Sequence, residues 1–232
     1  MLTRLIARQI NSQANYPLSF LIPYSENARR KSLEALTKEI HQLWVVARIL
    51  MELNRLGKLE KVDLDFEQSS YHAIALFNCR DGPCSLWYEF DMYPPTMCRG
   101  MLWYKEASDE LKNFYKHVED ILRRRRLRRA PLRPDIAIIH GGAKCDELTQ
   151  GFKVKIIIEC KNWEYGYWAK DIDNQIIPYK EIFQPDIMVL ASLKKVPQYA
   201  KNMLSKYGIA VIDEVYPRGK GLEELLQIIR II

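Results

Sequence analysis

The chain has 232 residues, of which 48% are hydrophobic and 28% are charged, and it contains 10 glycines and 11 prolines. These proportions exclude a disordered or fibrous chain and allow one sizeable hydrophobic core, so we expect a single domain over 1–232. No apolar run approaches the roughly 20 residues that a membrane-spanning helix needs, which argues against a membrane protein.

The first half of the sequence predicts two helices with strands between them. A helix is expected over 26–56, ending at Gly57, and its predicted buried stripe is Leu33, Leu36, Ile40, Leu43, Trp44, Ala47 and Met51. Three β-type segments follow at 61–68, 72–79 and 84–93, and a second helix is expected over 105–129. These elements make an N-terminal helical and β elaboration over 1–130.

The second half alternates strands and helices. Strands are expected at 134–140, 154–160, 185–192 and 209–217, and helices at 169–183, 196–208 and 221–232, the first of them distorted by Pro178. This order predicts an α/β fold with a central mixed sheet flanked by helices, whose core occupies 131–232.

The five cysteines are Cys79, Cys84, Cys98, Cys145 and Cys160. Because their number is odd and no C-x-x-C pair occurs, we expect reduced thiols in a cytoplasmic protein. A structural zinc or iron–sulfur site is not expected, although the close spacing of Cys79 and Cys84 leaves it open.

The net charge of +6 is concentrated in one stretch. Residues 112–134 contain nine basic and two acidic side chains, and the densest part is the run Arg123, Arg124, Arg125, Arg126, Arg128 and Arg129. Such a cationic segment favours a polyanionic partner such as DNA, because neutralised phosphates release counterions. The alternatives are a solvated helix end that complements the helix dipole and, less favoured, a nuclear localisation signal.

Charged residues interrupt two of the predicted strands. Asp135 opens one of them, and Glu159 and Lys161 lie two positions apart near the end of "KVKIIIECK" and therefore point to the same face. If the strands are antiparallel neighbours, Asp135 lies beside Glu159, and the two carboxylates repel each other unless a cation lies between them.

A divalent cation such as Mg²⁺ or Mn²⁺ suits this oxygen-rich position, with Asp135, Glu159 and the backbone carbonyl of Cys160 as ligands. Such an ion neutralises a scissile phosphate and lowers the pKa of bound water. Lys161 then adds a fixed positive charge at the transition state. The residues thus predict metal-dependent hydrolysis of a phosphodiester. The alternative is that Asp135 is only a turn residue and that Glu159 and Lys161 form an ordinary pair on an edge strand.

Pro134-Asp135, followed after 23 residues by Glu159-Cys160-Lys161, resembles the signature of the PD-(D/E)XK nuclease superfamily. The resemblance covers Arg133 to Ser192 and implies a restriction-endonuclease-like core that cleaves nucleic acid with Mg²⁺. It assigns metal binding to Asp135 and Glu159 and the catalytic lysine to Lys161. It also implies, by analogy with nucleases that act in pairs, a homodimer.

Further along, "QIIPY" resembles the Q-x-x-x-Y element of the RecB-like branch, with Gln175 orienting the site and Tyr179 contacting a phosphate. Pro178 within it departs from that pattern. Because members often take a further acid from the first helix, Glu39 is the candidate third acid, and Gln42 lies near it. For Glu39, Gln175 and Tyr179 a surface or packing role is the alternative.

Two other functions remain open: a catalytically inactive nucleic-acid-binding protein on the same fold, and an interaction protein whose arginines bind acidic protein. The aromatic residues Trp163, Tyr165, Tyr167 and Trp168 follow the Glu159 strand, where they could stack on unpaired bases or fill a dimer interface. The Gly219-Lys220-Gly221 segment lacks P-loop spacing, so no nucleotide cofactor is expected.

Overall fold

The computed structural model describes residues 33–64, 72–89, 108–127, 133–142 and 152–232. Its centre is a seven-stranded sheet in the order β1 to β7. The strands are β1 (Leu59–Val62), β2 (Ala75–Cys79), β3 (Gly82–Tyr88), β4 (Ile136–His140), β5 (Lys153–Lys161), β6 (Ile187–Ser192) and β7 (Ile209–Ile212). Neighbours from β1 to β5 run antiparallel, whereas β5, β6 and β7 are parallel. The expected α/β class with a mixed sheet flanked by helices is confirmed.

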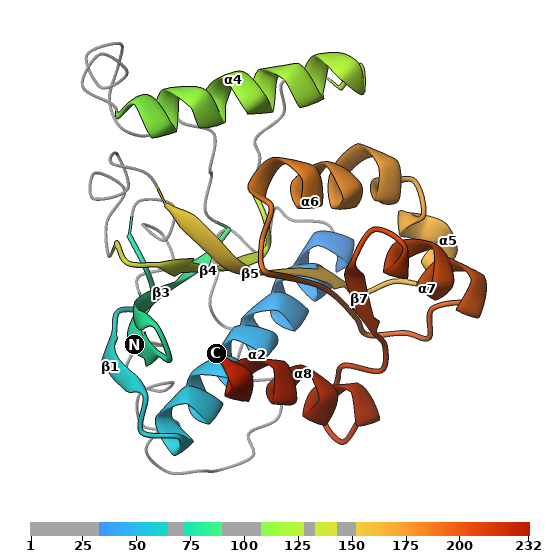
Figure 1. Cartoon of the computed structure of the whole chain (residues 1–232). Coiled ribbons are helices and arrows are strands. Elements are labelled where there is room, and N and C mark those ends of the chain that lie inside the picture. Colours follow the sequence, from blue (N-terminus) through green and yellow to red (C-terminus); the bar gives the residue numbers. More distant parts are fainter. Residues whose placement is uncertain (1–32, 65–71, 90–107, 128–132, 143–151) are drawn as a thin grey trace.

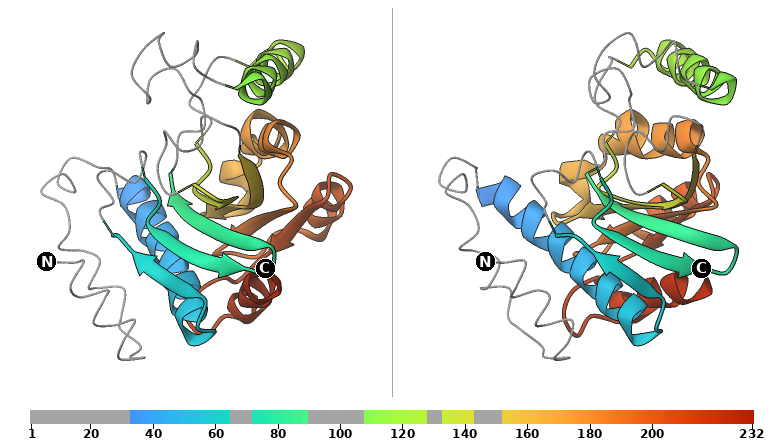
Figure 2. Two further views of the ribbon diagram at one scale, coloured as in Figure 1. Left: turned by 60° about the vertical axis from the view of Figure 1, so that its left-hand side comes forward. Right: turned by 90° about the vertical axis from the view of Figure 1, so that its left-hand side faces the viewer.

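Helices cover both faces of this sheet (Figure 1). One face is covered by α2 (Leu33–Arg55) and α8 (Lys220–Ile231), and the other by α4 (Asp109–Arg124), α6 (Ile177–Phe183) and α7 (Gln198–Ser205). Figure 2 shows α4 outermost, stacked on α6 rather than directly on the sheet. Two hydrophobic clusters result, one on each face. Helices are needed on both faces because the parallel strands connect through crossovers.

The two faces divide the side chains of β5. Ile158 and Cys160 belong to the cluster under α2 and α8, and Ile157 belongs to the cluster under α4 and α6. Because side chains alternate along a strand, Glu159 and Lys161 leave the sheet on the α6 side. The strand is buried from Val154 to Lys161, so these charged groups lie inside the protein and not on an exposed edge.

The buried face of α2 differs from the predicted stripe. Its fully buried apolar residues are Val45, Val46, Ile49, Leu50 and Leu53, whereas Leu43, Trp44 and Met51 are only partly buried and the side chains of Leu33 and Leu36 lie outside the description. The helix packs against both the sheet and α8, so apolar residues are needed around a wide arc. The predicted stripe followed one edge of that arc.

The helix expected over 169–183 consists of two parts. A π-helical turn, η4 (Ile172–Ile176), precedes α6, and Pro178 lies in the first turn of α6. Proline is tolerated there because the amide it lacks has no intrahelical acceptor. The helix expected over 169–183 is thus distorted, and the distortion is a wider turn that contains Gln175 and precedes the proline. A further short helix, α5 (Tyr165–Trp168), was not predicted.

Two cysteines form a disulfide, which corrects the expectation of reduced thiols. Cys79 and Cys84 lie on either side of the β2–β3 turn and are joined, with their Cα atoms 5.9 Å apart. The hairpin pairs Cys79 with Gly82 and Cys84 with Phe77, so the two cysteines are diagonal neighbours near the turn. Cys160 is free and buried, and Cys98 and Cys145 lie outside the described residues. The cysteine-based reason for a cytoplasmic location therefore does not hold for this pair. Among the described residues no helix is long and apolar enough to cross a membrane.

A buried carboxylate joins α2 to α8. Glu52 is 6% exposed and accepts hydrogen bonds from Arg55 Nε at 3.0 Å and from Arg230 Nε at 2.6 Å. Hydrogen bonding by Arg55 outweighs burial and, with Arg230, lowers the pKa of Glu52 to about 2.

Replacing Glu52 with glutamine is expected to lower the free energy of unfolding by about 2 kcal/mol at pH 7, because the charge-assisted bonds to both arginines are lost. A carboxylate with a depressed pKa stabilises the fold above its ordinary pKa of 4.5, and this contribution disappears as the pH falls toward 2. Urea denaturation should therefore show a larger difference in the free energy of unfolding between wild type and variant at pH 7 than at pH 3. An equal difference at both pH values would contradict this account.

Candidate active site at the ends of β4 and β5

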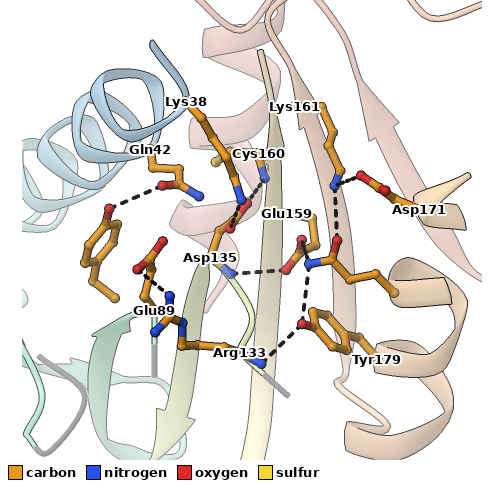
Figure 3. A network of polar contacts seen from close by, with 12 residues as sticks. Lys38, Gln42, Glu89, Arg133, Asp135, Glu159, Cys160, Lys161, Asp171 and Tyr179 are labelled. Atoms are coloured by element: carbon orange, nitrogen blue, oxygen red, sulfur yellow. Dashed lines mark hydrogen bonds and ion pairs between the residues drawn. The ribbon is translucent and has the colours of Figure 1, made fainter. Parts of the chain in front are cut away.

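The two strand carboxylates lie side by side where β4 begins and β5 ends (Figure 3). Ile136 pairs with Ile158, and Asp135 and Glu159 come next on their strands. The Asp135 amide donates to Glu159 Oε1 at 3.1 Å, and the Cys160 amide donates to Asp135 Oδ2 at 2.8 Å. Asp135 is 2% exposed and Glu159 is fully buried. The structure thus brings the two predicted acids together. The Cys160 amide lies beyond the last residue pair of β4 and β5, and the Asp135 side chain accepts its hydrogen bond.

Gln175 and Tyr179 hold the other side of Glu159. Gln175 Nε2 donates to Glu159 Oε2 at 3.1 Å and to Tyr179 Oη at 3.4 Å, and Tyr179 Oη also accepts from the Arg133 amide at 3.2 Å. These contacts place Gln175 in the site, as the sequence predicted. Tyr179 is 4% exposed, so its ring packs in the core while its hydroxyl contacts the network. The contact of its hydroxyl with a phosphate stays a prediction.

Lys161 points from the same strand into this network. Its Nζ donates to Asp171 Oδ2 at 2.8 Å and to Gln175 Oε1 at 3.3 Å, and the residue is 5% exposed. Asp171 follows α5 and was not predicted as a site residue, because nothing in its local sequence marks it as the partner of Lys161. Gln175 therefore bridges the acid and the amine, because its NH₂ group faces Glu159 and its oxygen faces Lys161.

A second lysine, missed in the sequence, reaches the acids from the opposite side. Lys38 of α2 lies with Nζ 3.2 Å from Asp135 Oδ1 (Figure 3). Lys38 lies on the inward face of α2 because it precedes His41, Gln42 and Val45 at helical spacing, and all three are buried. The predicted third acid, Glu39, is the next residue and is only partly buried. Its charge acts on Tyr88 and Glu89, and its role as a metal ligand stays a prediction.

Glu89 is a further acid that the sequence did not single out. It follows β3 in a left-handed conformation with φ of 46°, and its amide donates to the Asp135 carbonyl at 2.9 Å. Its side chain pairs with Arg133 Nη2 at 3.2 Å. Burial raises the pKa of Glu89, and the negative charge of Asp135 raises it further against the opposing effect of Arg133. Three acids from three adjacent strand ends therefore share one region.

The electrostatics follow from burial of these like charges. Burial first, and the neighbouring Asp135 second, raise the pKa of Glu159 to about 8. Burial lowers the pKa of Lys38, but the attraction of Asp135 and Glu159 outweighs it and the net shift is upward. Burial also raises the pKa of the Cys160 thiol, which makes a thiolate ligand unfavourable. Cys160 contacts the site through its backbone amide, and a role for its carbonyl stays a prediction.

Asp135 and Glu159 carry the kind of oxygen atoms that a hard divalent cation prefers. Within the described ranges no three His, Cys, Asp or Glu side chains are grouped so that they could hold a metal ion. An ion would therefore have the carboxylates of Asp135 and Glu159 and would complete its shell with water or substrate oxygens. Mg²⁺ is characteristically held by one or two carboxylates in this way.

The arginine run divides into paired and exposed members. Arg125 Nε donates to Glu181 Oε2 of α6 at 2.7 Å, and its Nη2 also contacts Glu181. Arg124 Nη2 lies 3.2 Å from the same carboxylate but is 68% exposed. Arg123 and Arg126 are exposed, whereas Arg128 and Arg129 lie outside the described residues. Arg125 is thus committed to holding α4 on α6, which leaves Arg123, Arg124 and Arg126 toward solvent.

Aromatic side chains gather just beyond Lys161. Tyr167 is 69% exposed, Tyr199 of α7 is 66% exposed and Trp163 is 36% exposed. Trp163 lies 6.0 Å from Tyr167, and Tyr165 packs edge-on against Tyr199 at 5.7 Å, both measured between ring centroids. Trp168 is buried and anchors the turn through its indole N–H on the Trp163 carbonyl. Base stacking and a dimer interface both stay predictions for this surface.

Comparisons of the chain with protein-family models, with curated proteins and with solved structures give no significant match.

The raised pKa of Glu159 has a measurable effect on stability. Without metal, the folded protein holds a proton on Glu159 that the unfolded chain releases near pH 4.5, so the free energy of unfolding should fall as the pH rises from 4.5 toward 8. Glu159→Gln should lose this dependence. The test is to measure the free energy of unfolding of wild type and Glu159→Gln in EDTA at several pH values between pH 5 and pH 8.5.

His41 makes the free energy of unfolding rise with pH over part of the same pH range, because burial lowers its pKa in the folded protein. That contribution is common to wild type and variant, so the difference between the two curves isolates Glu159. Parallel curves for the two proteins would show that Glu159 does not hold the extra proton.

Proposed function

We propose that this protein is a metal-dependent nuclease that hydrolyses phosphodiester bonds of DNA. The observation that carries the proposal is the juxtaposition of Asp135 and Glu159, buried at adjacent strand ends, with Lys161 on the same face of β5 as Glu159. Burying two carboxylates next to each other costs stability, so the arrangement calls for a function that uses concentrated negative charge.

Each residue has a distinct task in this proposal. Asp135 and Glu159 would hold a Mg²⁺ or Mn²⁺ ion, which supplies charge neutralisation at the phosphate and a more acidic water. Lys161, fixed by Asp171 and Gln175, directs its positive charge toward the attacked phosphate. Gln175 orients Glu159 through its amide, and Tyr179 fixes Gln175 in turn. The rigid strand ends limit the motion of the two acids.

The order of elements supports the same proposal at the level of fold. A helix (α2), antiparallel strands ending in β5, a helix (α6) and a parallel strand (β6) follow each other, as the resemblance to the PD-(D/E)XK superfamily implies. We infer a restriction-endonuclease-like core from this order together with the positions of Asp135, Glu159 and Lys161. Strands from both halves of the chain join one sheet, in keeping with a single domain over 1–232.

A second function is favoured by one observation. The ammonium of Lys38 already neutralises Asp135, 3.2 Å from Oδ1, so the acid pair has a cation of its own. In a catalytically inactive nucleic-acid-binding protein on the same fold, Lys38 would stay paired with Asp135 and no metal would bind there. Retention of DNA binding in EDTA, with no cleavage under any divalent metal, would identify it.

Cleavage should require Lys161 but not the other buried lysine of β5. Lys161→Met is expected to lower Mg²⁺-dependent cleavage of plasmid or single-stranded DNA at least about 100-fold, because the fixed charge at the phosphate is lost. Lys155→Met is the matched control, since Lys155 is 7% exposed on the same strand but pairs with Asp81.

Asp135→Asn should abolish cleavage while DNA binding persists. If wild-type protein cuts neither DNA nor RNA with Mg²⁺ or Mn²⁺, the nuclease proposal fails and the binding protein takes its place. Equal losses in the Lys155 and Lys161 variants would indicate a general defect of the strand.

DNA affinity should depend on the exposed arginines. Arg123→Ala combined with Arg126→Ala is expected to weaken binding and to reduce the slope of log affinity against log salt concentration by about 2, since two phosphate contacts are removed. Arg125→Ala removes the same kind of charge but also breaks the contact with Glu181. It should therefore lower the melting temperature clearly, while its effect on DNA affinity should be smaller than that of the double variant. Titrations at several salt concentrations, with melting curves, test this. An unchanged slope in the double variant would exclude these arginines from the interface.

A further inference from the structure

All four oxygens of the two site carboxylates already have donors. Asp135 Oδ2 accepts from the Cys160 amide at 2.8 Å, and Glu159 Oε1 accepts from the Asp135 amide at 3.1 Å. Glu159 Oε2 accepts from Gln175 Nε2 at 3.1 Å, and Asp135 Oδ1 pairs with Lys38 Nζ at 3.2 Å. Each of these oxygens keeps a second lone pair, so the three neutral donors leave room for a cation, whereas the positive charge of Lys38 at Asp135 Oδ1 directly opposes one.

The four donors differ in their freedom to leave. Two are backbone amides at the ends of buried strands, and they are fixed by the sheet. Gln175 is held at both ends of its amide by Tyr179 and Lys161. The side chain of Lys38 is 40% exposed and lies on a flexible four-carbon stem, so it has a route to solvent. Lys38 is thus the donor that can withdraw without disturbing the fold.

The charge of Lys38 suits a temporary counter-ion. Burial lowers the pKa of Lys38, but the attraction of Asp135, Glu159 and Glu89 together raises it above its usual range. Lys161 and Arg133, the other cations of the network, are directed to Asp171 and to Glu89. Among the described residues, Lys38 is the cation in direct contact with Asp135.

We propose that Lys38 is a built-in counter-ion that occupies Asp135 in the metal-free protein, and that a divalent cation binds the Asp135–Glu159 pair by displacing the Lys38 ammonium. The inference rests on the proposed function in taking these carboxylates as the metal site. Lys38 is then a positioning residue that sets metal affinity: it stabilises the acids before metal arrives and competes with the metal afterwards.

The test measures metal binding directly by calorimetry with Mn²⁺ on the full chain. Lys38→Met should lower the Kd for Mn²⁺ about tenfold, because the competing cation is gone. In EDTA the same variant should melt at a lower temperature than wild type, and Mn²⁺ should raise its melting temperature by more than it raises that of wild type.

Lys61→Met is the matched control, because Lys61 is exposed on β1 and its loss changes the net charge equally. Lys38→Gln is a second variant, which keeps a hydrogen-bond donor for Asp135 while removing the charge, and it should also bind Mn²⁺ more tightly. It serves if Lys38→Met does not fold.

The outcomes separate this inference from the proposed function. Equal Kd values for wild type and both Lys38 variants, with binding abolished by Asp135→Asn, would overturn the role of Lys38 and leave the metal site intact. Binding that is unaffected by Asp135→Asn would remove the metal from these carboxylates and overturn the proposed function with it. Tighter binding by both Lys38 variants, without cleavage by any protein, would support the counter-ion and reject the nuclease.

Discussion

Two carboxylates that the fold buries side by side are the constraint on which the rest of this site depends. Asp135 and Glu159 end neighbouring antiparallel strands, and neither can move away from the other without breaking the ladder. Their mutual repulsion must be offset locally, because burial and Asp135 raise the pKa of Glu159 so that it keeps its proton without metal, and backbone amides, the Gln175 amide and the Lys38 ammonium contact the pair. Each of these partners comes from a different element, so the site helps to define how strands and helices meet.

The helical segment formed by η4 and α6 places Gln175 and Tyr179 beside the two acids. Its first turn is π-helical, and such turns are frequent at functional sites because they redirect a side chain. Gln175 lies within that turn and contacts both Glu159 and Lys161. Tyr179 follows in α6, where Pro178 needs no amide acceptor. Pro178, which departs from the expected Q-x-x-x-Y pattern, is therefore compatible with a Gln–Tyr contact.

The sequence predicted the central features of the site from the spacing within one strand and from the expected pairing of two neighbouring strands. Charged residues in an apolar strand, two apart, necessarily share a face, and Asp135 and Glu159 were correctly expected to meet. Lys38 was missed because Val45, Val46 and Ile49 are as apolar as the predicted stripe, and only packing against α8 and the sheet decides which face turns inward.

Other features depend on residues that lie far apart in the sequence or on a strand register. The Cys79–Cys84 disulfide follows from the register of the hairpin, which the sequence did not reveal. Arg125 and Glu181 are paired across 56 positions, and nothing in the arginine run distinguishes Arg125 from its neighbours. Asp171 is a partner of Lys161 only because α5 turns the chain back.

The attachment of α4 has a consequence for where its exposed arginines lie relative to the site. Besides the contacts of Arg124 and Arg125, His117 Nε2 lies 3.1 Å from the Glu181 carbonyl, so three residues of the outer helix and its C-terminal cap meet one residue of α6. Glu181 stands two positions after Tyr179, whose hydroxyl belongs to the network around Glu159. The cationic end of the outer helix is therefore attached to the same helix, α6, whose Tyr179 contacts the hydrogen-bond network around Glu159. The contacts to Glu181 therefore fix the position of the cationic end of α4 relative to these two acids, so the distance between the exposed arginines and the site is set by the fold.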